Sequence, residues 1–152
     1  LLLVVYSSLK ASTERPINRN IVNKEHIIFI GNMGKSYSEL IEYGADRVLD
    51  SASELQAMDI RLLDVSSSCE FANFFILMTA QSPRHMRAVT EEIESELKNI
   101  RLTLHHAEGD QNSGWSLLDY GDLVVHLFAE EYREYYALED AWPDAKTVRI
   151  IQ

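Results

Sequence analysis

The sequence has one cysteine, Cys69, among its 152 residues. A single thiol excludes an intramolecular disulfide and any zinc site built from several cysteines, and it makes a reducing compartment the default expectation. Long apolar runs are also missing, because no stretch approaches the ~20 residues that cross a bilayer. The opening run Leu1–Val5 is shorter than the core of a secretory signal, which spans about 7–15 residues. We therefore expect a cytoplasmic protein that neither enters a membrane nor is exported.

Basic side chains are also scarce. The chain has 14 lysines and arginines against 24 aspartates and glutamates, which gives a formal net charge of −10. Proteins that bind nucleic acids use Lys and Arg to replace the counterions of the phosphates, so this balance argues against a nucleic-acid binder. A basic protein surface is the expected partner.

The remaining composition is that of one globular domain. Apolar residues make up 46% and charged residues 25% of a chain that is long enough to bury a core. Residues 1–35 differ from the rest, because two short apolar runs flank a polar stretch that contains Pro16, and we expect an irregular arm there. Regular patterning begins at Ser36, which predicts a domain over residues 36–145 and a short tail over 146–152.

Hydrophobic periodicity predicts the order of helices and strands. Apolar residues three and four apart indicate a helix over about 38–57, and the pair Ser82-Pro83 marks the start of a second helix. An acidic, tyrosine-rich helix is expected over 130–140. Apolar runs indicate strands at 60–65, 74–80, 102–106, 115–119 and 123–128. The last two strands form a hairpin, a loop precedes them over 108–114, and the mixture favours a two- or three-layer α/β fold with 74–80 at the centre of a mixed sheet.

Two features resemble parts of nucleotide-handling sites. Gly34-Lys35-Ser36 lies between a strand-like run and a helix, as in a phosphate-binding loop, but Phe29 stands where that loop needs its first glycine. Asp119 and Asp122 flank a tight turn, where paired acids can hold magnesium, yet Asp at both shoulders of a turn is ordinary turn chemistry. We expect no catalytic residue and no cofactor, and a nucleotide-binding or nucleotidyltransferase-like enzyme is the alternative interpretation.

Histidines are the candidate metal ligands. His105 and His106 are adjacent on an expected strand and therefore point to opposite faces, which makes it hard for them to share one ion. His85 stands apart, and His126 near Asp119 or Asp122 is the remaining combination. A strand histidine that is hydrogen-bonded or half exposed is the commoner case, so no metal site is predicted.

The segment from Glu108 to Asp144 concentrates the negative charge of the chain. It holds ten carboxylates and one basic side chain, Arg133. Its seven large aromatic residues are Trp115, Tyr120, Phe128, Tyr132, Tyr135, Tyr136 and Trp142. Large aromatic side chains are common anchors of protein–protein contacts, and an acidic rim steers a basic partner. We expect Phe128 and Tyr135 to belong to the core, whereas Trp115, at the end of a polar loop, is equally consistent with a contact role.

Three short segments carry a resemblance to a known family. Gly114–Phe128 (GWSLLDYGDLVVHLF), Tyr132–Tyr136 (YREYY) and Leu138–Trp142 (LEDAW) are similar to the Iojap/RsfS family of ribosomal silencing factors. The match covers about Ser38–Asp144 and includes the 74–80 strand and the helix start at Ser82. The resemblance implies a mixed sheet of about five strands flanked by helices, like a nucleotidyltransferase without its catalytic motif.

The resemblance also implies a function without catalysis. Members bind a basic protein of the large ribosomal subunit, the fourteenth of the L series, block association with the small subunit and repress translation. Free members are often dimeric, so a homodimer is expected. We assign partner contacts to Trp115, Leu117, Asp119, Tyr120, Asp122 and Phe128. A dimeric structural domain with no ribosomal partner is the third interpretation.

Overall fold

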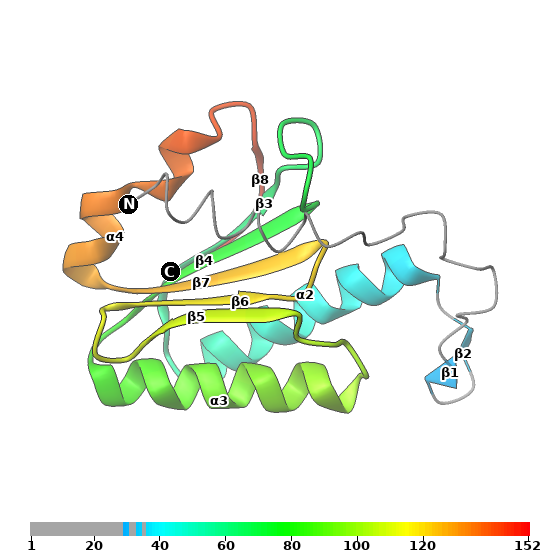
Figure 1. The fold of residues 1–152 in the computed structure, drawn as a ribbon, viewed down its shortest axis with the longest axis horizontal. Coiled ribbons are helices and arrows are strands. Elements are labelled where there is room, and N and C mark those ends of the chain that lie inside the picture. Colours follow the sequence, from blue (N-terminus) through cyan, green and yellow to red (C-terminus); the bar gives the residue numbers. More distant parts are fainter. Residues whose placement is uncertain (1–28, 31–32, 35) are drawn as a thin grey trace.

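The computed structural model of the chain describes residues 29–30, 33–34 and 36–152. The irregular arm expected over 1–35 therefore lies mostly outside the described residues. The parts of it that are described, β1 (Phe29–Ile30) and β2 (Met33–Gly34), pair antiparallel as a separate two-stranded sheet. The main body is a six-stranded sheet with helices on both faces (Figure 1).

The main body begins with α2 (Tyr37–Glu54). The chain then forms β3 (Met58–Asp64), β4 (Phe74–Ala80), α3 (Pro83–Asn99), β5 (His106–Asp110), β6 (Trp115–Asp119), β7 (Leu123–Ala129), α4 (Glu130–Tyr136), a short 3-10 helix η1 (Leu138–Ala141) and β8 (Lys146–Ile151). The strand order across the sheet is β5-β6-β7-β4-β3-β8. Within this sheet β4 and β7 pair in parallel and the other neighbours pair antiparallel, which confirms the expected mixed sheet.

One end of the sheet differs from the expectation. Residues 146–151, expected as a tail, form β8 and pair with β3, for example Arg61 opposite Ile150. Five residues of β8 are exposed, because the strand forms the edge of the sheet. Four of its six residues are β-branched and suit a strand, but nothing local indicates that they pair with β3, far earlier in the chain, so the sequence indicated five strands whereas the sheet has six.

The strand expected at 102–106 is displaced along the chain. The observed β5 covers His106–Asp110, which lies largely within the expected loop, and it pairs with β6 through the turn at 111–114. Leu102 instead helps to terminate α3, because its backbone N–H donates to the carbonyl of Leu97 at 2.9 Å. The apolar alternation at 102–106 was therefore a wrong indication of strand.

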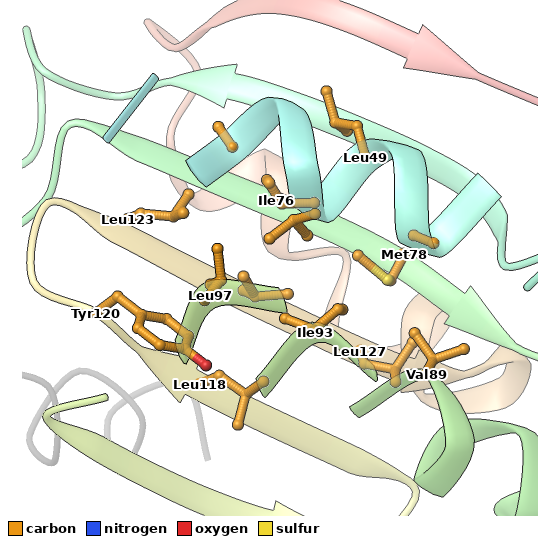
Figure 2. Close-up of a cluster of buried hydrophobic side chains, with 14 of the residues drawn as sticks. Leu49, Ile76, Met78, Val89, Ile93, Leu97, Leu118, Tyr120, Leu123 and Leu127 are labelled. Carbon is orange, nitrogen blue, oxygen red and sulfur yellow. The ribbon is translucent and has the colours of Figure 1, made fainter. Parts of the chain in front are cut away.

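The larger part of the core lies between the sheet and the helices α2 and α3. Figure 2 shows Leu49 of α2 and Val89, Ile93 and Leu97 of α3 packed against side chains of the sheet. Their spacing of three and four residues places one apolar stripe of each helix on the strands, as the periodicity predicted. In the described part of the chain no helix is long and apolar enough to cross a membrane.

The opposite face of the sheet is covered by α4, η1 and the loop between β3 and β4. Its buried cluster includes Phe75, Leu117 and Phe128, with Trp142 packed against it. The expected helix over 130–140 is divided here, because Ala137 has a left-handed backbone conformation with φ of 40° and ends α4. The fold therefore has three layers, with β4 and β7 buried on both sides (Figure 1).

The start of α3 is locked to the end of α2. The Ser82 hydroxyl accepts from the His85 backbone N–H at 3.1 Å, and Pro83 occupies the first helical position, as the sequence predicted. The His85 ring bonds to the backbone at both helix ends. Its Nδ1 accepts from the Gln81 N–H just before α3, and its Nε2 lies 2.8 Å from the carbonyl of Leu55 at the end of α2. Both ring nitrogens of His85 are thus engaged in helix capping.

The Ser82 cap yields a stability prediction. Replacing Ser82 with alanine removes the acceptor for the His85 N–H, and we expect the free energy of unfolding to fall by about 1 kcal/mol in urea titrations. Ser95→Ala, an exposed change in the same helix, is the control and should change stability by no more than a few tenths of a kcal/mol. Equal effects of the two substitutions would contradict the capping role.

Candidate functional site

A ladder of aromatic rings lies on the α4 face of the β6–β7 hairpin. Trp115 pairs with Phe128 across the two strands, and Leu117 pairs with His126, so these side chains share one face. The Trp115 ring is stacked with His126 and Phe128 at centroid distances of 6.2 Å, with planes within 10° of each other. Tyr136 of α4 lies over this ladder, 6.4 Å from Trp115 and 6.2 Å from Phe128.

His126 is the buried polar centre of the ladder. Its side chain is 0% exposed, and its Nδ1 accepts from the Trp115 indole N–H at 3.4 Å. Burial, with a smaller contribution from Arg133, lowers the pKa of His126 from 6.5 to about 3. The ring is therefore neutral at physiological pH, and its acceptor position fixes the orientation of Trp115.

Trp115 lies at the open end of the ladder. It is half-buried and follows Gly114, whose φ of 74° suits glycine and whose carbonyl accepts from the Ala129 N–H at 2.8 Å. A Cβ on Gly114 would lie 2.4 Å from the Tyr132 ring of α4. This close approach ties the turn before β6 to α4 and holds Trp115 beside that helix.

Helix α4 adds a row of tyrosines and carboxylates to this surface. Tyr132 and Tyr136 are half-buried and 6.0 Å apart, and Tyr135 packs edge-on to Tyr136 with 79% of its side chain exposed. The expectation that Tyr135 belongs to the core is wrong. We call Trp115, Tyr132, Tyr135, Tyr136 and the exposed Glu130, Glu131 and Glu134 the α4 surface.

The one basic side chain of the region points inward. Arg133 is buried, and its NH2 donates to Glu139 at 2.6 Å and lies 3.3 Å from Asp59 of β3. Asp59 also pairs with Arg61 at 2.8 Å. Two arginines and two acids therefore neutralise one another beside the sheet.

The carboxylates of α4 point away from basic side chains in the described part of the chain. Within the described ranges no ion pair joins Glu130, Glu131 or Glu134 to a basic side chain. The exterior of α4 is therefore negative.

Four of the six expected contact residues are core residues. Leu117, Tyr120 and Phe128 are 1–2% exposed, and Asp119 is 6% exposed. The contact role assigned to these side chains stays a prediction, and in the free chain they offer little accessible surface. Phe128 fits its alternative assignment to the core.

The turn between β6 and β7 explains the aspartates. The buried Asp119 carboxylate accepts from the Gly121 N–H at 2.7 Å, which forms an Asx turn. Asp122 is half-buried, and its carbonyl accepts from the N–H groups of Asn73 and Phe74, both at 2.9 Å. Asp122 and Trp115 are thus the members of the expected set that keep accessible side-chain surface.

The features that resembled nucleotide sites have local structural roles. Ser36 is the N-cap of α2, where its hydroxyl accepts from the Glu39 N–H while the Glu39 carboxylate accepts from the Ser36 N–H at 2.6 Å. A carboxylate thus occupies the helix end that a phosphate would approach. Lys35 lies outside the described residues.

Histidines, cysteine and acids do not converge on a common point in the described part of the chain. No group of three or more of these side chains there is arranged to hold a metal ion. His106 lies 3.5 Å from Glu108 on the edge strand β5, and His126 is buried in the ladder.

Sequence reasoning missed how the ladder and α4 combine. Arg133 stands in the sequence as the one basic side chain of an acidic segment, and its pairing with Asp59 joins distant positions in the chain. A usable signal was present in Glu139, which lies six residues after Arg133 and one turn beyond the end of α4. The packing of Tyr132 on Gly114 had no comparable signal.

The chain is similar to a family of known proteins. The family model described as "Ribosomal silencing factor during starvation" matches residues 38–152. Ribosomal silencing factor RsfS of Halalkalibacterium halodurans is 30% identical over 76% of this chain and 95% of its own length. The chloroplastic protein Iojap of Zea mays is 36% identical over 66% of this chain, which corresponds to 43% of that protein.

Two further comparisons extend the likeness. A mouse protein named "Mitochondrial assembly of ribosomal large subunit protein 1" is 25% identical over 66% of this chain and 46% of its own length. A crystal structure of a Chromobacterium violaceum protein is 27% identical, superposes with a TM-score of 0.65, and covers 68% of this chain and 86% of that one. The three-layer fold with its mixed sheet is therefore shared with a solved structure.

His126 generates a prediction for the pH dependence of stability. Because the pKa of His126 is lowered from 6.5 to about 3 in the folded chain, the unfolded chain takes up one more proton between these values, and stability is lost as pH falls through this window. Between pH 6.5 and 5 we expect the free energy of unfolding of the wild type to fall by up to about 2 kcal/mol more than that of His126→Phe.

Urea titrations at several pH values test this prediction. The carboxylates titrate in both proteins, so the difference between the two curves isolates the histidine. Above pH 7.5 or so the two dependences should run parallel, because His126 is neutral in both states there. Identical curves throughout would show that His126 does not resist protonation in the folded chain.

Proposed function

The chain belongs to the family of ribosomal silencing factors, and from this membership we propose that it represses translation by binding the large ribosomal subunit. The proposed partner is a basic protein of that subunit, the fourteenth of the L series, and the proposed action is steric, because a bound chain occupies the surface that the small subunit must reach. We also propose a cytoplasmic location.

The α4 surface is the observation that supports docking. Rings gathered around Trp115 supply apolar area that a partner can bury, and Glu130, Glu131 and Glu134 lie beside them without basic neighbours. Basic ribosomal proteins match this charge, and complementary charge raises the rate of encounter while desolvated rings hold the complex. The combination of exposed rings and unpaired carboxylates suits the binding of a basic protein surface.

Trp115 is the proposed anchor of the contact. Its indole rests on His126 and Phe128, which fix its orientation before a partner arrives and so lower the entropy lost on binding. Leu117 and Phe128 support it from within the core. Asp122 is the proposed acceptor for Lys or Arg at the far end of the hairpin.

A homodimer of the free protein is also proposed. Val148 and Ile150 of β8 are 55% and 52% exposed on the edge of the sheet, where a second chain could cover them. Sedimentation velocity over a range of concentrations measures this association, and a wild-type chain that stays monomeric would contradict the dimer without affecting the proposed ribosomal contact.

Trp115→Ala is the direct test of the anchor. We expect the variant to bind large subunits at least ~2 kcal/mol more weakly than the wild type, because truncation removes the central apolar contact. Co-sedimentation with purified large subunits measures the affinity, and the urea midpoint of the free variant reports its folding. Tyr43→Ala on α2, on the other side of the sheet, is the control and should bind like the wild type.

Charge reversal tests the steering. Glu131→Lys with Glu134→Lys should slow association with large subunits and reduce its dependence on salt, whereas Glu54→Lys on α2 should change neither. If Trp115→Ala folds normally and still binds large subunits with wild-type affinity, Trp115 is not part of the contact. Turnover of a nucleoside triphosphate with magnesium by the wild type would favour the enzymatic alternative.

A further inference from the structure

A pocket of about 400 Å³ lies at the C-terminal end of α3. Its walls come from α3, from the segment that follows it and from the end of β6. The lining residues are Glu94, Lys98, Arg101, Leu102, Thr103, Leu104 and Tyr120. Because Tyr120 belongs to the cluster under α2 and α3, the pocket and the α4 surface are on opposite faces of the sheet.

Tyr120, one of the residues that line this pocket, has an unsatisfied hydroxyl group. Its side chain is 2% exposed, and its hydroxyl has no hydrogen-bond partner. Figure 2 shows the ring reaching from the hairpin toward α3, with the oxygen at its far end. Burial, with a smaller contribution from Glu94, raises the pKa of Tyr120, so the hydroxyl keeps its proton and is a donor at neutral pH. A buried donor without a partner is costly unless a bound group satisfies it.

Two unpaired cations lie at the same pocket. Lys98 and Arg101 form no ion pair with any carboxylate in the described part of this chain, although its net charge is −10. The two residues are close in sequence, on the last turn of α3 and just beyond it. With the carboxylate of Glu94 on the same wall, they leave the lining of the pocket with a net charge of +1 in a protein of net charge −10.

The backbone conformation of Arg101 places this residue just beyond the end of α3. Arg101 has φ of 62° and occupies the position after the helix cap, where its N–H donates to the Lys98 carbonyl at 2.9 Å. Glycine is the favoured residue in this helix-ending motif, because a Cβ is strained at positive φ. Gln56 follows the cap of α2 with a similar φ of 61°, so this conformation is a feature of both helix ends, and at Arg101 it leads the chain past α3 beside the pocket.

We propose that this pocket binds a small phosphorylated metabolite. Its phosphate lies between Lys98 and Arg101 and accepts from the Tyr120 hydroxyl, while Glu94 and Thr103 hydrogen-bond the hydroxyl groups of its body. In this arrangement Lys98 and Arg101 pair with the oxygens of a phosphate monoester, which carries a charge of nearly −2 at neutral pH, while the Glu94 carboxylate is kept for the neutral hydroxyl groups of the body. The pocket volume is that of a small-ligand site, and Leu102 and Leu104 supply its apolar wall. This site is independent of the proposed ribosomal contact.

Calorimetric titration of the full chain with ribose 5-phosphate tests the proposal, with inorganic phosphate and ribose as the comparison probes. We expect saturable binding of ribose 5-phosphate, weaker binding of inorganic phosphate and none of ribose. Tyr120→Phe retains the ring and removes the donor, and it should weaken binding at least ~10-fold. Lys146→Gln, which removes a cation of β8 away from the pocket, should leave binding within about twofold of the wild type.

Arg101→Gly separates binding from folding. Glycine suits the positive φ, so this variant should unfold at a higher temperature than the wild type while it binds ribose 5-phosphate at least ~10-fold more weakly. Absence of saturable binding up to about 10 mM would overturn the proposal. Wild-type affinity in both Tyr120→Phe and Arg101→Gly would also overturn it, because binding would then occur elsewhere.

Discussion

The parallel pairing of β4 with β7 is the contact on which the other layers depend. Both strands are apolar on both faces, so each face must be covered, and α2 with α3 cover one while α4 with η1 cover the other. The remaining strands extend the sheet outward by antiparallel pairing. The large helical core carries the bulk of the buried apolar surface, which leaves the thinner α4 layer able to expose part of its rings.

Side-chain alternation along the β6–β7 hairpin divides one of the segments that carry the family resemblance between the two faces of the sheet. Trp115 and Leu117 lie on the α4 face, whereas Leu118 and Tyr120 lie on the face of α2 and α3. One hairpin therefore supports a proposed protein contact on one side and a proposed metabolite pocket on the other. The two sites share backbone but no side chain.

Charge is distributed by the same layers. Arg133 points into a neutral network with Glu139, Asp59 and Arg61, so it does not offset the carboxylates of α4. Lys98 and Arg101 are on the opposite face and remain unpaired among the described residues. Unpaired carboxylates therefore lie on the exterior of α4, and two unpaired cations lie at the pocket on the opposite face of the sheet.

The sequence alone determined the elements that depend on local pattern: the apolar stripes of α2 and α3, the Ser82-Pro83 helix start, the central strand β4, the hairpin and the family. These follow from periodicity and capping, which act between residues close in the chain. Tertiary structure decided the rest. The strand β8, the limits of β5, the exposure of Tyr135, the burial of Arg133 and the pocket at Tyr120 all depend on partners distant in sequence. The local sequence around an aromatic or charged residue is the same whether its side chain ends up buried or exposed. Only the packing of distant elements decides which of these occurs.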